Sequence, residues 1–514
     1  MQSAPILEQA FAAIPDLIRA HAADRPRRAA LVLEERVLDY AALDALMDRV
    51  AAALQRDGLA PQGAIAICAA TSLEYVAVFL GALRAGVTVA PLAPSSTGGS
   101  LAGMAADSGA KLLFLDADAA AALAPFRDRY GARHVALEGG LDAWLAPAGA
   151  APAPVAIEPG WAFNIIYSSG TTGAPKGIVQ PHSMRWGQVQ RSAAYAYGAD
   201  SVTLLATPLY SNTTLVCFFP TVAMGGTSVL MGKFDAAGYL ALAEKYRATH
   251  TMLVPVQYQR IMALPDFGRY DLSSFRFKLC TSAPFAAGLK ADILRRWPGG
   301  LVELYGLTEG GGTCILVAHE HPDKLHTVGR PAPGHDIRLI DEAGREVAPG
   351  EAGEVVGRSP VMMTGYHDQP RLTAETEWFD AEGRRYLRTG DIGRFDADGF
   401  LTLLDRRKDL IISGGFNIYP SDLEAVLLGH PAVVEVAVVG VPSERWGETP
   451  VAFVVPKSGS AVTADELLAW TNGRVGKIQR LAAVEVVDSL PRSAIGKVMK
   501  RELREAYRGR AGTR

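Results

Sequence analysis

Residues 167–177, Tyr-Ser-Ser-Gly-Thr-Thr-Gly-Ala-Pro-Lys-Gly, are the stretch that decides the fold. They follow an apolar run, Phe163 to Ile166, which predicts a buried strand. Glycines let the backbone turn so that its N–H groups face an anion, and the hydroxyl side chains add further donors. Lys176 can bring a compact positive charge to the same anion. The stretch predicts a phosphate-binding loop, although a solvated turn rich in hydroxyls would have the same composition and the spacing is not that of a Walker loop.

The bulk composition sets the class of protein. A chain of 514 residues is long enough for more than one domain and for a large buried core. Its hydrophobic fraction of 49% and charged fraction of 20% are those of an ordinary soluble globular protein. The net charge of −3 argues against a nucleic-acid partner and against a membrane-binding face.

The cysteines and the N-terminus indicate a cytoplasmic protein. The four cysteines make no paired spacing of a disulfide framework or a zinc site; they are Cys68, Cys217, Cys280 and Cys314. Residues 1–20 contain acidic residues and apolar positions at helical spacing, which predicts an amphipathic surface helix rather than a signal peptide. The most apolar region, residues 64–94, is interrupted by Glu74 and Arg84, so no stable membrane insertion is expected.

Alternating strands and helices predict a parallel α/β layer. We expect a helix over 38–59, N-capped by Asp39 and stopped by Gly58, and then a strand, a helix ended by Gly86 and a second strand. The expected ranges of those last three elements are 64–69, 72–83 and 87–92. The same order of strand, helix and strand is expected again at 228–231, 236–246 and 251–254.

The pattern of expected secondary structure changes after about residue 334. Short strands at 336–340, 353–357 and 401–403, separated by glycine and aspartate turns, predict a small β-rich unit. A second α/β pattern follows, with helices at 420–428 and 464–475 and strands at 433–441 and 451–455. We therefore predict an α/β protein with a large N-terminal domain of layered α/β subdomains plus this β-rich unit (1–404), a hinge (405–408) and a small mobile α+β C-terminal domain (409–514).

Signatures along nearly the whole chain resemble those of the adenylate-forming superfamily of acyl-CoA synthetases, adenylation domains and luciferases. Residues 168–177 resemble its phosphate loop, and the other matching segments, in chain order, are 84–94 (RAGVTVAPLAP), 305–309 (YGLTE), 386–391 (YLRTGD), 405–409 (DRRKD), 413–420 (SGGFNIYP) and 491–497 (PRSAIGK). Several independent motifs in the right order are far more specific than any one of them.

The resemblance implies an acid–CoA ligase, in which a carboxylic acid attacks ATP to give an acyl-adenylate and pyrophosphate, and coenzyme A then takes the acyl group. ATP and coenzyme A would be co-substrates and Mg²⁺ the metal. Two alternatives stay open: a stand-alone adenylation enzyme that loads a carrier protein, and a non-catalytic nucleotide-binding relative. A homodimer is compatible with the resemblance.

Family roles carry over to the nucleotide residues. The resemblance implies that Glu309 binds magnesium, that Thr308 contacts the α-phosphate, and that Tyr305 lies against the adenine. By itself Glu309 would be taken for an exposed loop glutamate. The other residues expected around ATP are Ser168, Ser169, Gly170, Thr171, Thr172, Gly173, Lys176, Ser282, Ala283, Gly306, Asp391 and Arg406. Asp391 would accept from the ribose hydroxyls, although an aspartate beside a glycine is also typical of a turn.

The C-terminal part would supply the mobile groups. The resemblance implies that Lys408 is the pivot, that Lys497 is the catalytic lysine bridging the carboxylate and the α-phosphate, and that Gly414 and Gly415 line the tunnel for coenzyme A. A solvated lysine and a plain glycine turn are the ordinary interpretations of the same residues.

The acyl pocket is predicted from its wall residues. The expected wall residues are small or apolar, which suits a fatty or aromatic acid; they are Tyr210, Asn212, Thr213, Thr281 and Gly310. Many relatives have a histidine after the aromatic residue of this segment, and this chain has Ser211 there. The pocket wall is therefore expected to differ from theirs.

Overall fold

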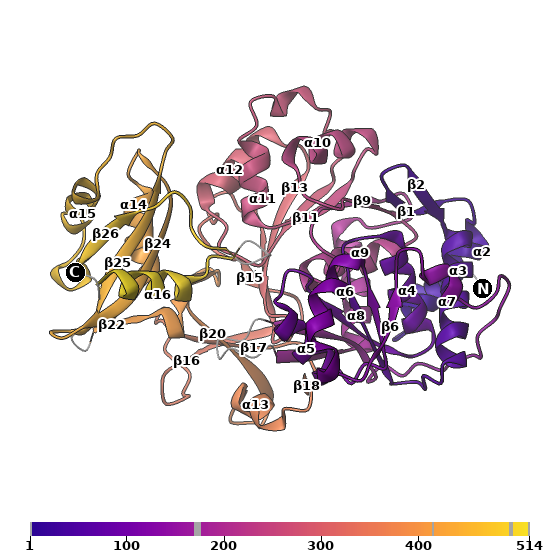
Figure 1. The fold of residues 1–514 in the computed structure, drawn as a ribbon. Helices are drawn as coiled ribbons and strands as arrows, with labels where there is room; N and C mark the ends of the chain where they lie inside the picture. The colour runs from indigo at the N-terminus through magenta and orange to yellow at the C-terminus, as the bar shows by residue number, and fades with distance from the viewer. Residues whose placement is uncertain (1–2, 169–175, 414–415, 493–496, 512–514) are drawn as a thin grey trace. The chain divides into compact units, whose positions relative to one another are not determined.

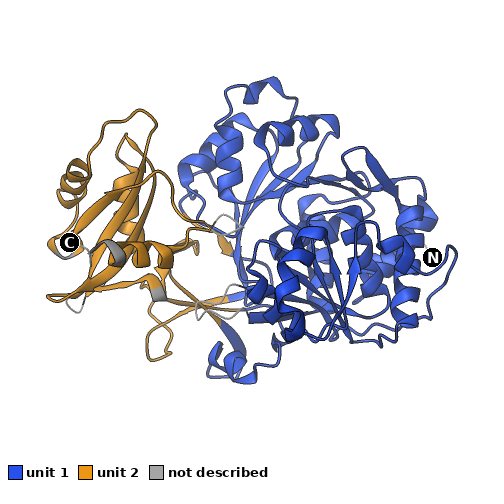
Figure 2. Ribbon diagram, viewed as in Figure 1, with its two compact units in different colours: residues 1–326, 331–336, 358–387 blue, residues 327–330, 337–357, 388–514 orange. Residues whose placement is uncertain are grey.

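The computed structural model describes residues 3–168, 176–413, 416–492 and 497–511. The chain forms two compact units, coloured separately in Figure 2. The first comprises residues 1–326, 331–336 and 358–387, and the second comprises 327–330, 337–357 and 388–514. The expected hinge at 405–408 lies inside the second unit and stays a prediction.

A seven-stranded sheet in the first unit contains the strands on both sides of the glycine-rich stretch. Its order is β18-β8-β7-β4-β3-β5-β6. The bounds are β3 Ala64–Cys68, β4 Thr88–Leu92, β5 Leu112–Leu115, β6 Arg133–Ala136, β7 Ala162–Ser168, β8 Lys176–Pro181 and β18 Gly365–Tyr366. Strands β6, β5, β3, β4 and β7 pair in parallel, whereas β8 is antiparallel to both β7 and β18.

A nine-stranded sheet forms the other large layer of this unit. Its order is β15-β14-β13-β12-β11-β9-β10-β1-β2, and all pairs from β1 through β13 are parallel. The bounds are β1 Ala29–Leu33, β2 Arg36–Asp39, β9 Val202–Leu205, β10 Thr227–Leu230, β11 His250–Leu253, β12 Phe277–Cys280, β13 Gly300–Gly306, β14 Thr313–Val317 and β15 Arg330–Pro331. The predicted parallel α/β layers are confirmed.

The helices of the first unit cover these two sheets (Figure 1). Their bounds are α1 Ser3–Leu7, α2 Ile14–Asp24, α3 Tyr40–Arg56, α4 Leu73–Arg84, α5 Gly98–Asp107, α6 Ala117–Leu123, α7 Leu141–Trp144, α8 His182–Arg191, α9 Asn212–Ala223, α10 Ala236–Lys245, α11 Pro255–Met262, α12 Ala287–Arg296 and α13 Pro370–Glu375. The largest apolar cluster draws on α3, α4, α9 and both sheets. Phe163 of β7 lies at its centre, 4.9 Å between ring centroids from Phe219 of α9.

Local sequence signals place several helix ends. Asp39 accepts from the backbone N–H of Ala42 at 2.8 Å and caps α3, as predicted, and Ser72 caps α4 by accepting from Tyr75 at 3.0 Å. Gly58 and Gly86, which follow these helices, have φ of 78° and 68°, a conformation that glycine adopts without a steric penalty.

The single helix expected over residues 1–20 is wrong. The structure has two helices, α1 and α2, with α2 beginning one residue before Pro15. Proline lacks the N–H needed inside a helix and its ring clashes with the carbonyl four residues earlier, so it is tolerated only in the first turn. Leu17 and Ile18 are fully buried whereas Asp16 and Arg19 are exposed, so α2 has the predicted amphipathic character.

The second unit contains a five-stranded sheet with three helices around it. The order is β23-β22-β25-β24, with β26 paired to β25. The bounds are β22 Ile411–Ser413, β23 Phe416–Ile418, β24 Val433–Ser443, β25 Gly447–Pro456, β26 Ala483–Val486, α14 Pro420–Leu428, α15 Ala464–Asn472 and α16 Lys500–Ala511. The range predicted for α14 is confirmed, and strand β25 begins four residues earlier than predicted.

The β-rich part of the chain forms a further sheet, in the order β16-β17-β20-β19 with β21 paired to β20. Its strands are β16 Asp336–Ile340, β17 Gly353–Arg358, β19 Glu377–Phe379, β20 Arg385–Phe395 and β21 Leu401–Arg406. The last two strands place Asp391 opposite Arg406.

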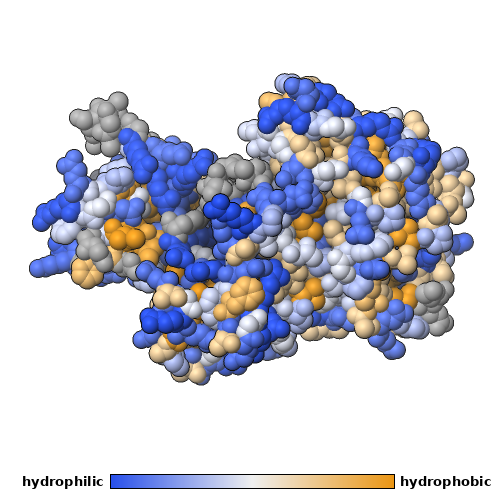
Figure 3. All heavy atoms as spheres, turned by 90° about the horizontal axis from the view of Figure 1, so that it is seen from below, coloured by the Kyte–Doolittle hydropathy of each residue, from blue (hydrophilic) through white to orange (hydrophobic). Residues whose placement is uncertain are grey.

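Two features of the structure concern contact with a membrane, namely the distribution of apolar side chains on its surface and the length and hydropathy of its helices. On the face drawn in Figure 3, apolar side chains occur in small separate patches among hydrophilic ones. Among the described helices, none has both the length and the apolar character that a membrane crossing requires.

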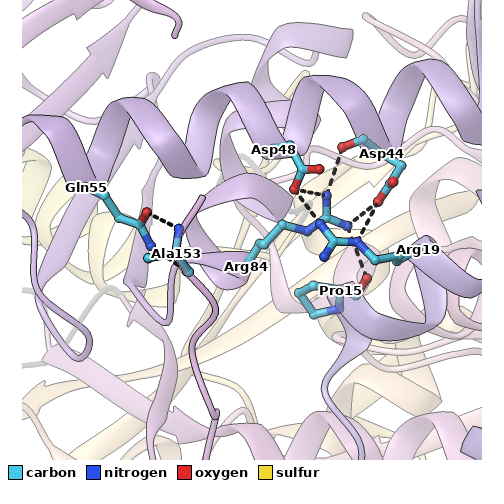
Figure 4. Close-up of polar contacts among 7 residues, drawn as sticks. All are labelled: Pro15, Arg19, Asp44, Asp48, Gln55, Arg84 and Ala153. Atoms are coloured by element: carbon cyan, nitrogen blue, oxygen red, sulfur yellow. Dashed lines mark hydrogen bonds and ion pairs between the residues drawn. The ribbon is translucent and has the colours of Figure 1, made fainter. Parts of the chain in front are cut away.

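Arg84, at the end of α4, joins three helices through a buried ion-pair cluster (Figure 4). Its guanidinium donates to Asp44 and, at 3.0 Å, to Asp48 of α3, and to the carbonyl of Pro15 in α2. The Arg84 side chain is 7% exposed, whereas Arg19, which pairs with the same two carboxylates, is 53% exposed.

We expect Arg84→Met to lower the free energy of unfolding by about 2 to 3 kcal/mol, because it leaves half-buried carboxylates and a carbonyl without their main donor. Arg19→Met is the matched control and should cost less than about 1 kcal/mol, as exposed pairs do. Urea unfolding of the two variants makes the comparison, and equal losses would contradict it.

Candidate functional site

Several predicted site residues of the first unit lie at or just after the carboxyl ends of two neighbouring parallel strands, β12 and β13. Thr281, Ser282 and Ala283 come directly after β12, while Tyr305 and Gly306 end β13 and Thr308 and Glu309 follow it. The carboxyl ends of parallel strands meet at the same edge of a sheet, where α/β proteins place their ligands. The Thr281 hydroxyl donates to the carbonyl of Leu304 at 2.7 Å and joins the two segments.

Ser282 has a strained backbone. Its φ of 82° lies in the left-handed region, which costs a residue with a Cβ about 1 kcal/mol or more. The strain is held by a hydrogen bond of 2.7 Å between the hydroxyls of Ser282 and Thr213, the latter near the start of α9. Ser282, which was expected around ATP, and Thr213, which was expected in the wall of the acyl pocket, are therefore in direct contact.

The loop 308–310 is tethered by its backbone carbonyls. Gln180 donates to the Thr308 carbonyl at 2.6 Å, the N–H of Met363 donates to that of Glu309 at 2.9 Å, and Ser359 donates to that of Gly310 at 2.7 Å. Gly310 has φ of 80°, and a Cβ there would lie 2.7 Å from the Cε of Met184. A residue with a Cβ would be strained at this φ and would displace the end of the Met184 side chain, so glycine is favoured here.

The carboxylate of Glu309 is oriented by a tyrosine. The Tyr366 hydroxyl donates to Oε1 of Glu309 at 2.8 Å, and the Nζ of Lys176 lies 5.4 Å from the centre of the Tyr366 ring. Register explains this placement, because β18 pairs with β8 and Tyr366 is opposite Ile178. Burial, reinforced by the Glu309 charge, raises the pKa of Tyr366, so its hydroxyl keeps the proton that it donates.

A buried polar network lies beside this loop. The guanidinium of Arg185 in α8 donates to Oδ1 of Asn164 at 3.1 Å, to Oδ1 of Asn212 at 2.9 Å and to Oε1 of Gln180. Asn164 of β7, Gln180 of β8 and Arg185 are all fully buried. Asn212, predicted as a wall residue of the acyl pocket, therefore directs its amide oxygen at Arg185. Tyr210 lies two residues before α9 and is half-buried.

In the second unit, two predicted nucleotide residues are paired with each other. Nε of Arg406 lies 3.2 Å from Oδ1 of Asp391, across the β20–β21 ladder. The Asp391 side chain is only 10% exposed, and its backbone N–H donates to the Thr389 hydroxyl at 3.0 Å. This carboxylate is fixed in position by its own strand pair.

The segment expected to be the hinge begins with one aspartate and is followed by another, and both carboxylates have partners. Asp405 accepts from the backbone N–H of Ser421 at 3.0 Å, and burial raises the pKa of Asp405. Asp409, at the other end, accepts from Arg504 of α16 at 2.5 Å. The predicted pivot Lys408 lies between them in a short 3₁₀ turn, Arg407–Asp409. Lys497 is half-buried and lies three residues before α16, so this helix is sequence-adjacent to the predicted catalytic lysine.

Some predicted positions lie outside the described residues. Of the glycine-rich stretch, only its first and last parts are described, since Ser168 ends β7 and Lys176 begins β8. The predicted residues outside the description are Ser169, Gly170, Thr171, Thr172, Gly173, Gly414 and Gly415.

Three residues at the described site were missed by sequence reasoning: Gln180, Arg185 and Tyr366. Gln180 interrupts the apolar run of a strand, which is a sequence signal for a buried polar group with a partner. Arg185 and Tyr366 carry no such signal, because an arginine in an amphipathic helix and a tyrosine after a glycine are common on surfaces.

Two family models match the chain. The model of the AMP-binding enzymes matches residues 18–367, and that of the AMP-binding enzyme C-terminal domain matches residues 422–497. The second match ends at Lys497.

Similar proteins cover nearly the whole chain. It is 36% identical to the feruloyl-CoA synthase of an Amycolatopsis species over 91% of this chain and 94% of that protein. It is 33% identical to the indoleacetate–CoA ligase of Aromatoleum aromaticum, over 96% and 98%. Among solved structures, ATP-bound MatB from Rhodopseudomonas palustris is similar with a TM-score of 0.88 and 30% identity, over 96% of this chain and 99% of that chain.

We expect Ser282→Gly to be more stable than Ser282→Ala by about 1 kcal/mol, because both lose the bond to Thr213 but only glycine is relieved of the left-handed strain. Urea unfolding of the two variants measures the difference. An alanine variant as stable as the glycine variant would show that residue 282 is not held in this conformation.

Proposed function

This chain belongs to the AMP-binding enzyme family, in its acid–CoA ligase branch, and from this premise we propose that its substrate is an aromatic carboxylic acid. The enzyme activates an acid with ATP to an acyl-adenylate and pyrophosphate, and transfers the acyl group to coenzyme A. The observation that carries this function is the match to both family models together with acid–CoA ligases that are similar over more than nine-tenths of the chain.

The choice of an aromatic acid is supported by the relatives and by the wall of the proposed pocket. Feruloyl and indoleacetyl groups both carry an aromatic ring attached through a short linker to the carboxyl carbon. In this chain, the hydroxyls of Thr213 and Ser282 bond each other, and that of Thr281 bonds a backbone carbonyl. Side chains whose polar atoms are satisfied in this way present mainly carbon to a ligand, which suits a ring.

In the first step, the proposed residues position two anions and neutralise charge. Lys176 and the glycine-rich loop would hold the phosphates, Thr308 would donate to the α-phosphate, and Tyr305 would lie against the adenine. Lys497 would bridge the attacking carboxylate and the α-phosphate. Such a reaction asks for little covalent work from the protein, so positioning and charge stabilisation carry most of the rate.

The described residues fit a nucleotide-bound Mg²⁺. They contain no group of three potential metal-ligating side chains. This suits magnesium, which usually takes one or two protein carboxylates and completes its octahedron with phosphate oxygens and water. Glu309 offers one oxygen while Tyr366 holds the other, so it would be the protein ligand. Mg²⁺ would neutralise charge on the phosphates.

For the second step, we place the domain boundary at the predicted hinge, 405–408, with Lys408 as the pivot and Gly414 and Gly415 beside the coenzyme A arm. Asp391 and Arg406 would hold the ribose and the phosphate through both steps. The pairing of these two side chains supports a shared role. The four cysteines, which are free and buried, support a reducing cytoplasmic location.

The test of the proposed function is pyrophosphate release from Mg-ATP with cinnamic-type, indole, short, medium-chain and long-chain acids, each with and without coenzyme A. We expect the highest kcat/KM with an aromatic acid and an acyl-CoA product. Lys497→Ala should release no pyrophosphate while still forming thioester from supplied acyl-adenylate. Best activity on a fatty acid would refute the substrate class. Pyrophosphate release without thioester would favour carrier-protein loading, and no release with any acid would refute catalysis.

Removing the hydroxyl that orients Glu309 tests the proposed metal ligand. Tyr366→Phe leaves the carboxylate free to rotate, so we expect kcat/KM for Mg-ATP to fall about tenfold and the Mg²⁺ requirement to rise. Tyr386→Phe is the matched control, since the Tyr386 hydroxyl also donates to a carboxylate, that of Asp336, at 2.6 Å. Equal Mg²⁺ dependence in both variants and in the unchanged enzyme would contradict the role of Tyr366.

A further inference from the structure

We propose that Gln180, held in one orientation by Arg185, is a positioning residue for the Thr308–Glu309 loop and thereby sets the geometry of adenylate formation. The inference rests on the proposed function of that loop. It adds two residues, neither of which was expected from the sequence, to those that govern the first half-reaction.

The charge of Arg185 is the starting point. Its side chain is fully buried, and within the described ranges no carboxylate pairs with it. Burying an ion costs several kcal/mol unless oxygen acceptors replace water. Here amide oxygens do so, with Gln188 of the same helix accepting from Nη1 at 3.0 Å in addition to Asn164, Asn212 and Gln180. The guanidinium carbon also lies 5.7 Å and 5.5 Å from the ring centres of Phe163 and Phe219.

That charge decides which way the Gln180 amide faces. Oε1 of Gln180 accepts from Arg185 and, at 3.1 Å, from Nδ2 of Asn164. A flipped amide would turn its NH₂ group toward these two donors and its oxygen toward the carbonyl of Thr308, so all three contacts would become repulsive. The cation therefore selects the orientation in which Nε2 of Gln180 donates to the Thr308 carbonyl at 2.6 Å.

The bond to Thr308 joins the two parts of the proposed nucleotide site. Gln180 lies four residues after Lys176 on β8 of the seven-stranded sheet, whereas Thr308 follows β13 of the nine-stranded sheet. One amide thus directly joins the strand that follows the phosphate loop to the loop that carries Glu309, and so helps to set the distance between them. Displacements of about 1 Å at reacting groups can cost on the order of a hundredfold in rate, so this distance matters to catalysis.

Gln188 provides the control that separates positioning from core stability. Gln180 and Gln188 each accept from the same guanidinium, but in the described structure only Gln180 reaches the loop. Gln180→Met and Gln188→Met each remove one acceptor from Arg185, and only the first also cuts the link to Thr308. Gln180→Glu keeps an oxygen for Arg185 and replaces the donor to Thr308 by a second acceptor.

We expect Gln180→Met and Gln180→Glu to lower kcat/KM for Mg-ATP in pyrophosphate release about tenfold, with the KM of the acid little changed. Gln180→Glu should melt at or above the temperature of Gln180→Met because its carboxylate pairs with Arg185. Gln188→Met should keep the kcat/KM of the unchanged enzyme. Circular dichroism and thermal melting establish that each variant is folded, and calorimetry measures the Kd of Mg-ATP directly.

Two results would overturn the proposal. One is a loss of kcat/KM in Gln188→Met as large as in Gln180→Met, since the network would then act only by holding the core together. The other is a folded Gln180→Glu with the kcat/KM and the Mg-ATP Kd of the unchanged enzyme. Failure of the proposed function would show separately, as no pyrophosphate release by the unchanged enzyme. In that case the Kd of Mg-ATP still tests whether Gln180 positions the loop, because the link to Thr308 predicts weaker Mg-ATP binding in the Gln180 variants and not in Gln188→Met.

Discussion

A buried charge that has to be solvated by protein oxygens is the constraint on which the centre of the first unit depends. Arg185 is fully buried, and amide oxygens from β7, β8, α8 and the start of α9 converge on its guanidinium. Two of these elements belong to the seven-stranded sheet and α9 follows a strand of the nine-stranded one. A polar network of this kind is stable only when it is complete, so it allows few alternative placements of one sheet against the other. The apolar contact of Phe163 with Phe219 adds area at the same junction but fixes no direction.

Around this junction, the proposed site is held by positions that tolerate little change. Ser282 keeps a left-handed backbone that its bond to Thr213 helps to hold, and Gly310 has a positive φ at which a residue with a Cβ would be strained. Strained residues persist where the surrounding structure over-determines them, and they concentrate at ligand sites. Both positions border the segment from Tyr305 to Glu309. The rigidity of this segment therefore comes in large part from tethers to its backbone.

The sequence was informative where a signal is local and weak where it is not. Asp39, Ser72 and Gly86 act on backbone groups a few residues away, so the ends of α3 and α4 could be predicted from them. Pro15 is an equally local signal for a break between α1 and α2, which the single helix expected over residues 1–20 did not include. By contrast, Gln180 and Thr308 are 128 residues apart, and Tyr366 and Glu309 are 57 apart. Contacts of this kind depend on strand register and on the meeting of two sheets, which no single window of sequence contains.

The proposed nucleotide residues are divided between the two compact units, and the division follows from opposite needs of the two half-reactions. Adenylate formation needs a cation against two anions, which is the role proposed for Lys497. Thioester formation needs that space for a thiol. A lysine in the first unit, tethered as firmly as Thr308 and Glu309 are, would serve the first need and obstruct the second. In the second unit, Asp405 and Asp409 bracket Lys408 and contact different partners, Ser421 and Arg504. A rotation at Lys408 would thus change the contacts of Asp405 while Asp409 keeps α16, the helix that follows Lys497. The tethered loop of the proposed site and the cation proposed to move are in this way built from different kinds of contact.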